Sequence, residues 1–134
     1  MIVLDASVLA NLIGDDGDAG RAARAVLLRS GAGSIPDLAD VEAAAALRKI
    51  WLGGAITTER FEAAIEALID LPLDRYPSIA LMKRAFELRD NVTPYDATYV
   101  ALAEALDCPV VTLVGRLSRA PGIRCRVVML DQVA

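Results

Sequence analysis

The chain opens with MIVLDASVL at residues 1–9, where an apolar run leads directly into Asp5. A short apolar run without polar alternation is typical of a parallel strand that is buried on both faces. Asp5 then follows the carboxyl end of that strand, which is the edge where open α/β sheets bind their ligands. The stretch therefore predicts a parallel α/β fold and, at its end, a candidate functional residue.

Four further runs along the chain have the length and composition of short strands. Each is separated from the next by a longer segment with helical periodicity, so the strands are expected to pair in parallel through βαβ crossovers. We predict a single α/β domain over residues 1–134, with three α/β/α layers around a short, mostly parallel sheet. The predicted strands are residues 1–5, 33–35, 73–76, 110–114 and 126–130.

The helices are predicted from caps and periodicity. Residues 7–13 form a short helix, and a second runs from an Asp18 cap to Ser30. A long Ala-rich helix from Pro36-Asp37 to Gly53-Gly54 has apolar residues nearly all round and is expected to be buried on several sides. Three further helices are predicted. The first is capped by Thr57 or Thr58 and has a core face of Phe61, Ile65 and Leu68. The second begins at Pro77-Ser78 with a core face of Ile79, Met82 and Phe86, and the third runs from Thr93-Pro94 to Leu106.

The composition excludes several classes of protein. Hydrophobic residues make up 55% of the 134 residues, enough for a core, but no apolar run approaches the roughly 20 residues that span a bilayer. With no basic N-terminal region and Asp5 interrupting the first apolar stretch, we expect a cytoplasmic protein with no membrane association. Histidine is absent, which removes imidazole catalysis, and the only cysteines, Cys108 and Cys125, are expected to be free thiols.

The net charge of −4 hides an uneven distribution of charge. Arg116, Arg119, Arg124 and Arg126 cluster near the C-terminus with no acidic residue among them. Arginine grips phosphate with paired donors, so Arg116 and Arg119 are candidates for RNA binding. A solvated basic surface explains the cluster equally well, and the sequence leaves both readings open.

Three acidic residues stand where the predicted sheet would gather them. Asp5 ends the first strand, whereas Glu42 and Asp96 lie in the first turns of helices that should begin at the same edge. Carboxylates that meet repel one another unless a cation lies between them, and Mg²⁺ with oxygen ligands is the usual cation in sites that act on phosphate esters. Taken singly, Asp5 and Asp96 could be helix caps and Glu42 a solvated position, but Glu42 stands in an otherwise apolar helix and needs a partner.

Other phosphate-handling folds fail at specific positions. An aspartyl phosphatase needs a second Asp where Ser7 stands, and a receiver domain needs a Lys after a late strand, whereas Lys49 and Lys83 both lie in predicted helices. No glycine–lysine loop that could bind nucleotide phosphates is present.

Four segments, in order, resemble the motifs of PIN-domain ribonucleases, in particular the VapC-type toxins of bacterial toxin–antitoxin pairs. They are residues 1–9, Pro36-Asp37-Leu38 followed by Glu42, TPYDATYVALAE at residues 93–104, and Val111-Thr112-Leu113 followed by Arg116-Leu117. Each motif is weak alone, but the four together span nearly the whole chain.

The resemblance implies an endoribonuclease that depends on Mg²⁺, with Mn²⁺ able to substitute. By position, Asp5, Glu42 and Asp96 would be the catalytic, metal-binding acids, and Ser7 and Thr112 would be hydroxyls that orient them. It also implies an RNA substrate, a homodimer and inhibition by a cognate VapB-type antitoxin.

One position departs from the resemblance. PIN domains commonly carry an acidic residue two positions after the Thr of the fourth motif, and this chain has Val114 there. Valine cannot bind a metal ion, so one metal suffices, a nearby acid substitutes, or activity is weakened; we hold that Val114 is an inactivating change. Two alternative functions therefore remain: a catalytically silent module that acts through its antitoxin, and an RNA-processing nuclease without an antitoxin.

Overall fold

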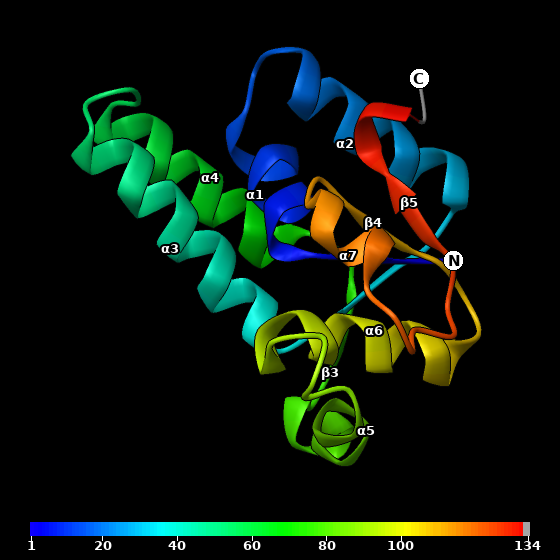
Figure 1. Ribbon diagram of the computed structural model, residues 1–134. Helices are drawn as coiled ribbons and strands as arrows, with labels where there is room; N and C mark the ends of the chain where they lie inside the picture. The colour runs from blue at the N-terminus through cyan, green and yellow to red at the C-terminus, as the bar shows by residue number, and fades with distance from the viewer. Residues whose placement is uncertain (133–134) are drawn as a thin grey trace.

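The computed structural model describes residues 1–132, and its centre is a sheet of five strands that are all parallel (Figure 1). The strand order is β3-β2-β1-β4-β5, which places the first strand in the middle. All five predicted strands are confirmed, and the sheet is wholly rather than mostly parallel. The strands are β1 (Ile2–Leu4), β2 (Gly33–Pro36), β3 (Asp74–Tyr76), β4 (Val110–Thr112) and β5 (Val127–Met129).

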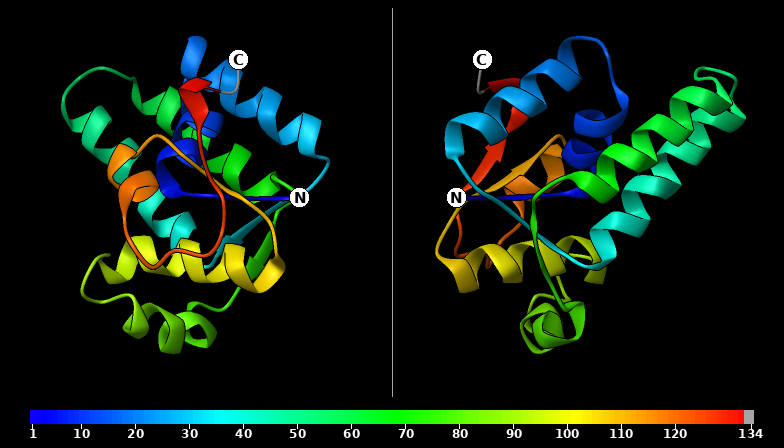
Figure 2. Two further views of the ribbon diagram at one scale, coloured as in Figure 1. Left: turned by 45° about the vertical axis from the view of Figure 1, so that its right-hand side comes forward. Right: turned by 180° about the vertical axis from the view of Figure 1, so that it is seen from behind.

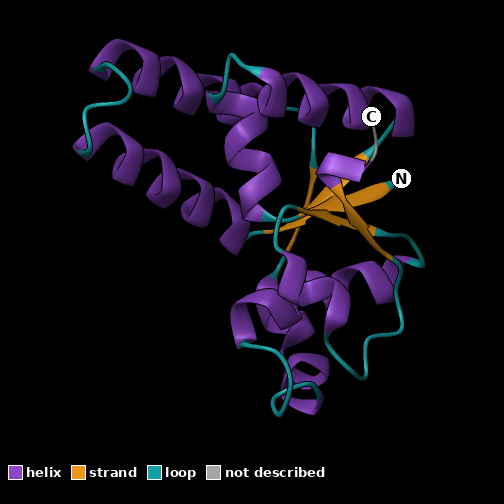
Figure 3. Ribbon diagram, turned by 45° about the horizontal axis from the view of Figure 1, so that its top comes forward, coloured by secondary structure: helices purple, strands orange, loops and turns teal. Residues whose placement is uncertain are grey.

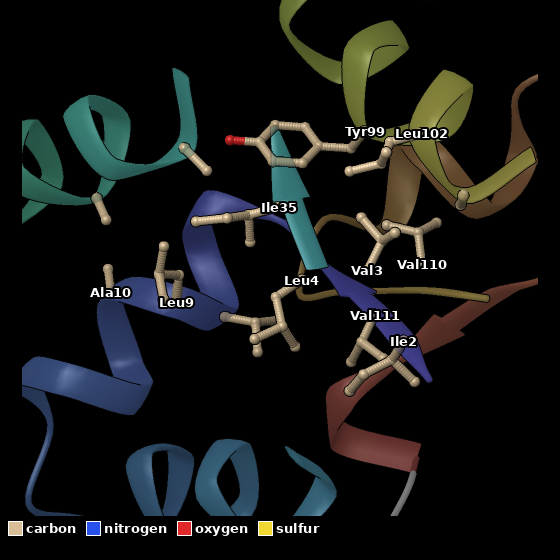
Figure 4. Packing of buried hydrophobic residues seen from close by; sticks show 14 of the residues in the cluster. Ile2, Val3, Leu4, Leu9, Ala10, Ile35, Tyr99, Leu102, Val110 and Val111 are labelled. Carbon is tan, nitrogen blue, oxygen red and sulfur yellow. The ribbon is translucent and has the colours of Figure 1, made fainter. Parts of the chain in front are cut away.

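The burial of each strand follows its place in the sheet. β1 is central, and Val3 and Leu4 are completely buried on opposite faces (Figure 4). β3 lies at one edge, where Asp74 and Arg75 are exposed. A central strand needs apolar residues on both faces, whereas an edge strand does not.

Helices cover both faces of the sheet (Figure 3). α1 (Ala6–Gly14) and α2 (Asp18–Ser30) lie on one face, and α6 (Pro94–Leu106) lies on the other, against β1, β2 and β4. α5 (Met82–Glu87) follows a short 3-10 helix, η1 (Ser78–Leu81), and packs on the outside of α6. The predicted three-layer arrangement is confirmed.

α3 (Leu38–Leu52) and α4 (Thr58–Asp70) form an antiparallel pair that extends beyond the sheet (Figure 2). Two short elements complete the described chain, α7 (Gly115–Arg119) after β4 and η2 (Leu130–Gln132) after β5. No helix among the described residues is both long and apolar enough to cross a membrane. Cys108 and Cys125 are half-buried free thiols.

Most helix ends follow the predicted signals. Asp5, Thr57 and Thr93 each accept a backbone hydrogen bond as N-caps, and Gly31 ends α2 in the left-handed conformation. The predicted cap of α2 is wrong. Asp18 lies inside the first turn and Gly17 is the cap, while the Asp15 side chain accepts from the backbone of Gly20 at 2.8 Å.

Two predictions of buried helix faces are also wrong. The long helix α3 exposes Val41 (73%) and Leu52 (59%), because it projects past the sheet and has neighbours on fewer sides. Ile79 (79% exposed) and Phe86 (64% exposed) do not form a core face, because η1 and α5 are an outer layer that packs mainly on α6 and leaves its other side open. The buried residues of that segment are instead Leu81, Ala85 and Leu88.

Candidate active site

Asp5 sits at the carboxyl end of β1 and is 5% exposed. Its Oδ1 accepts hydrogen bonds from the Ser7 hydroxyl at 2.5 Å and from the backbone of Val8 at 3.1 Å. Its Oδ2 accepts a hydrogen bond from the hydroxyl of Thr112. Asp5 is therefore both the N-cap of α1 and a fixed carboxylate at the sheet edge, so its two sequence interpretations are compatible.

The segment after β4 holds this carboxylate in place. Parallel pairing aligns Leu4 of β1 with Val111 of β4, so the next residues, Asp5 and Thr112, lie beside each other at the same edge of the sheet. The Thr112 hydroxyl also accepts from the backbone of Val114 at 2.9 Å, and the Ser7 hydroxyl accepts from the backbone of Leu113 at 3.3 Å. Both hydroxyls connect Asp5 to the turn that leads into α7.

Glu42 comes from the first turns of α3 and is only partly buried. The hydroxyl of Tyr99 donates to its Oε1 at 2.5 Å. Tyr99 is 2% exposed and lies between α6 and α3, with its hydroxyl directed toward α3 (Figure 4). Burial and the contact with Glu42 strongly raise the pKa of Tyr99, so the phenol remains a hydrogen-bond donor.

Asp96 lies in the first turn of α6, where its backbone N–H donates to the Thr93 hydroxyl at 3.3 Å. Its carboxylate does not return to cap the helix. Oδ2 instead accepts from Nε of Arg116 at 3.0 Å and lies 2.9 Å from Nη2 of the same guanidinium. The Arg116 side chain is 67% exposed, so this ion pair faces solvent.

The three acids are electrostatically coupled, as the predicted edge arrangement requires. Burial raises the pKa of Asp5, the hydrogen bonds from Ser7 and Thr112 oppose that shift, and the charge of Asp96 adds to the increase. Burial also raises the pKa of Glu42, and the charges of Asp96 and Asp5 contribute. The beginnings of α3 and α6 lie near each other in Figure 1, in agreement with this coupling.

The side chains of Asp5, Glu42 and Asp96 are not arranged to bind one metal ion together in this conformation. Across residues 1–132, no group of three or more Asp, Glu, Cys or His side chains has the arrangement needed to hold a metal ion. Glu42 is engaged by Tyr99, and Asp96 is engaged by Arg116.

The other predicted residues lie on and around α7. Val114 is the half-buried residue before that helix, and its backbone N–H donates to the Thr112 hydroxyl at 2.9 Å. Arg119 is exposed, and a β-carbon built at Gly115 would lie 3.1 Å from its Nη1, so its guanidinium folds back over the beginning of α7.

Tyr99 is the site residue that the sequence analysis did not single out. It stands three residues after Asp96, and residues at that spacing lie on neighbouring positions of a helix. A polar hydroxyl in an apolar, buried helix needs a partner, and this was the available signal.

The match to known proteins agrees with this geometry. The model of the PIN domain family matches residues 2–123, and the chain therefore belongs to that family. It is homologous to VapC ribonucleases. Ribonuclease VapC1 of Mycobacterium tuberculosis is 41% identical over 130 residues, which cover 93% of this chain and 94% of that protein. Ribonuclease VapC9 of the same organism is 35% identical over 132 residues, covering 98% and 100%.

Solved structures confirm the fold. The Rickettsia felis VapBC2 complex, determined with a DNA fragment from its promoter, superposes with a TM-score of 0.70 at 14% sequence identity. The superposition covers 96% of this chain and 98% of the matched chain.

Proposed function

We propose that this chain is a divalent-metal-dependent endoribonuclease that acts as the toxin of a VapBC-type pair. The observation that carries the proposal is the coupling of Asp5, Glu42 and Asp96 at the carboxyl edge of the sheet. The 41% identity to a VapC ribonuclease supports RNA as the substrate.

The donor set fits a hard divalent cation. All three groups are carboxylates, and the pKa values of Asp5 and Glu42 are raised partly by neighbouring negative charge, which a bound cation would offset. Asp5, Asp96 and Glu42 would hold Mg²⁺ or Mn²⁺, with Glu42 released from Tyr99 or bound through water. When bound, such an ion supplies Lewis acidity and neutralises charge that develops on a phosphodiester.

The surrounding residues prepare these carboxylates. The Ser7 and Thr112 hydroxyls hold the two oxygens of Asp5 and limit its rotation. Tyr99 fixes Glu42 through a phenol that stays protonated. The net reaction is hydrolysis: water oxygen bonds to phosphorus, the bond to the 3′ oxygen breaks, and that oxygen takes a proton, leaving a 3′-hydroxyl and a 5′-phosphate.

Arg116 is suited to hold the RNA backbone. Its side chain is largely exposed and reaches Asp96 from outside the acidic cluster. A guanidinium in that place can exchange one Asp96 contact for a phosphate oxygen of the substrate. Arg119, on the same short helix, offers a second cation to the strand.

Val114 weakens this site. Its backbone N–H donates to the Thr112 hydroxyl, which itself donates to Asp5, so an acidic side chain at position 114 would join the cluster of carboxylates. Valine supplies neither charge nor a lone pair, and we propose that it lowers metal affinity and cleavage. The same residue favours a second candidate function, a catalytically silent domain that acts by binding its antitoxin.

The proposed partners are a cognate VapB-type antitoxin that covers the acidic site and a second copy of the chain. Exposed apolar residues on α3, such as Val41 and Leu52, provide surface for these contacts. An RNA-cleaving toxin and its antitoxin meet in the cytoplasm, where we place the activity.

The decisive experiment compares RNA cleavage with Mg²⁺, with Mn²⁺ and with EDTA, using the parent chain and Asp5→Asn. We expect metal-dependent cleavage that EDTA and the substitution abolish. Cleavage that persists in EDTA contradicts the proposal. Absence of cleavage together with tight antitoxin binding would favour the silent module.

A further inference from the structure

Tyr95 is an exposed aromatic residue next to the acidic cluster. It is 64% exposed, and within residues 1–132 its ring and hydroxyl form no hydrogen bond, ring stacking or cation contact. It immediately precedes Asp96 in the first turn of α6.

The other five aromatic residues have structural neighbours. Trp51 and Phe61 pack with ring centroids 6.0 Å apart, and Phe86 lies beneath the guanidinium of Arg89 at 4.2 Å. Tyr99 is buried, and Tyr76 packs against the core. Tyr95 is therefore unlike the rest in offering an open ring.

The helical position of Tyr95 places it on the Glu42 side of the cluster. Residues four apart lie on one face of a helix, so Tyr95 stands one turn before Tyr99 on the face from which Tyr99 reaches Glu42. Arg116 reaches Asp96 through a separate contact from α7. The first turn of α6 thus carries an exposed aromatic residue next to Asp96, and α7 supplies a guanidinium to the Asp96 carboxylate.

We propose that Tyr95 stacks on an unpaired base of single-stranded RNA next to the phosphate that is cleaved. This inference rests on the proposed ribonuclease function. Every base presents a flat π-face, so stacking on tyrosine holds a strand without fixing its sequence, while arginine grips the backbone. The pair would select unpaired RNA, because a base within a duplex cannot leave its neighbours without cost.

The test measures RNA affinity without cleavage. In an Asp5→Asn background, fluorescence anisotropy follows binding of a short fluorescein-labelled single-stranded RNA of mixed sequence. We expect Tyr95→Ala to weaken binding by roughly 5- to 100-fold, the range typical for loss of one stacked base. Tyr95→Phe keeps the ring and should bind like the background protein.

Phe86→Ala is the matched control, since Phe86 has the same 64% exposure but lies on α5. It should leave RNA affinity unchanged. A strand of the same length made of abasic nucleotides supplies a second control, because without bases Tyr95→Ala and its background should bind equally.

Equal affinity of Tyr95→Ala and its background for the natural strand overturns the inference while leaving the ribonuclease proposal intact. An equal loss on the abasic strand also overturns it, because the contact would then not be stacking. If Tyr95→Ala loses antitoxin binding but keeps RNA binding, the residue belongs to the protein partner and the inference is wrong. Failure of the parent chain to bind or cleave RNA overturns the proposed function and this inference together.

Discussion

The hydroxyl of Thr112 donates a hydrogen bond to Oδ2 of Asp5, although the two residues are 107 positions apart in sequence. Parallel pairing of β1 with β4 makes this contact, since it brings the residues that follow Leu4 and Val111 to the same edge. Both side chains are buried, and among the described residues the Thr112 hydroxyl is the one hydrogen-bond donor to Oδ2 of Asp5. The pairing of β1 with β4 in the sheet therefore positions the Asp5 carboxylate in the site.

Replacing Thr112 by Val should destabilise the protein. The substitution keeps the shape but leaves a buried carboxylate oxygen and the backbone N–H of Val114 without their partner, at a cost of about 1–3 kcal/mol. Urea unfolding gives the free energy. Thr112→Ser retains the hydroxyl and should lose less than half as much; a loss in Thr112→Ser larger than that in Thr112→Val would show that packing of the methyl group matters more than the hydroxyl.

Asp5→Asn should separate stability from activity. Burial raises the pKa of Asp5 in the folded state, so proton binding stabilises the fold fully below the unfolded pKa, and that stabilisation is lost as pH rises through the folded pKa. Without metal and above the folded pKa, ionised Asp5 therefore costs stability, and the neutral Asn should be at least as stable as the parent. RNA cleavage should fall by more than roughly 100-fold, because loss of a residue that only orients a metal ligand can already cost about 100-fold and Asp5 is a proposed ligand.

Unfolding measured from pH 4 to pH 8 in EDTA checks the stability half of that prediction. The difference between Asp5→Asn and the parent should increase in favour of Asn as pH rises. A parent that becomes relatively more stable with rising pH would mean that the hydrogen bonds from Ser7 and Thr112 outweigh burial.

Val114→Asp should strengthen the metal site. A fourth carboxylate beside Thr112 adds an oxygen ligand, and we expect Mn²⁺ affinity by calorimetry to rise about 10-fold or more, with faster cleavage. Val114→Asn is similar in size and polar but uncharged, and should gain much less. Equal metal affinity and cleavage in Val114→Asp and the parent would reject the idea that Val114 is an inactivating change.

The Arg84–Glu104 pair offers a test of the fold away from the site. Arg84 Nε lies 2.7 Å from Glu104 Oε1, and the backbone of Arg124 donates to Oε2 at 2.8 Å. Burial alone would raise the pKa of Glu104, but these hydrogen bonds outweigh it and leave the pKa lowered. The resulting stabilisation is present above the unfolded pKa and is lost as pH falls through the folded pKa.

Glu104→Gln should therefore lower the free energy of unfolding at pH 7 by about 1–2 kcal/mol. The gap between variant and parent should close below about pH 4.3, the ordinary value for Glu. A gap that stays constant down to pH 3 would assign the loss to packing instead of charge.

Local patterns predicted the secondary structure and the positions of the acids. Buried strands such as Ile2–Leu4 are short apolar runs, and Thr93-Pro94 is an unambiguous helix start, so both could be recognised from neighbouring residues alone. The parallel direction of the strands follows from the βαβ connections, which put the carboxyl ends of all strands at one edge of the sheet. That is why Asp5, Glu42 and Asp96 could be assigned to one edge.

Contacts between layers could not be predicted in the same way. Phe86 has the spacing of a core residue, but whether a helix is covered depends on which elements lie outside it, and nothing covers α5 on that side in residues 1–132. The bond from Tyr99 to Glu42 joins two helices, and the pair of Arg116 with Asp96 depends on side-chain conformation. Such contacts are decided by tertiary packing, which local sequence does not encode.

The most direct test of the metal-site proposal is an anomalous difference map from crystals soaked in Mn²⁺. We predict a peak within coordination distance of Asp5 and Asp96, with Glu42 bound directly or through water and Arg116 displaced from Asp96. A peak elsewhere, or none at saturating Mn²⁺, would contradict a catalytic site built from these three acids.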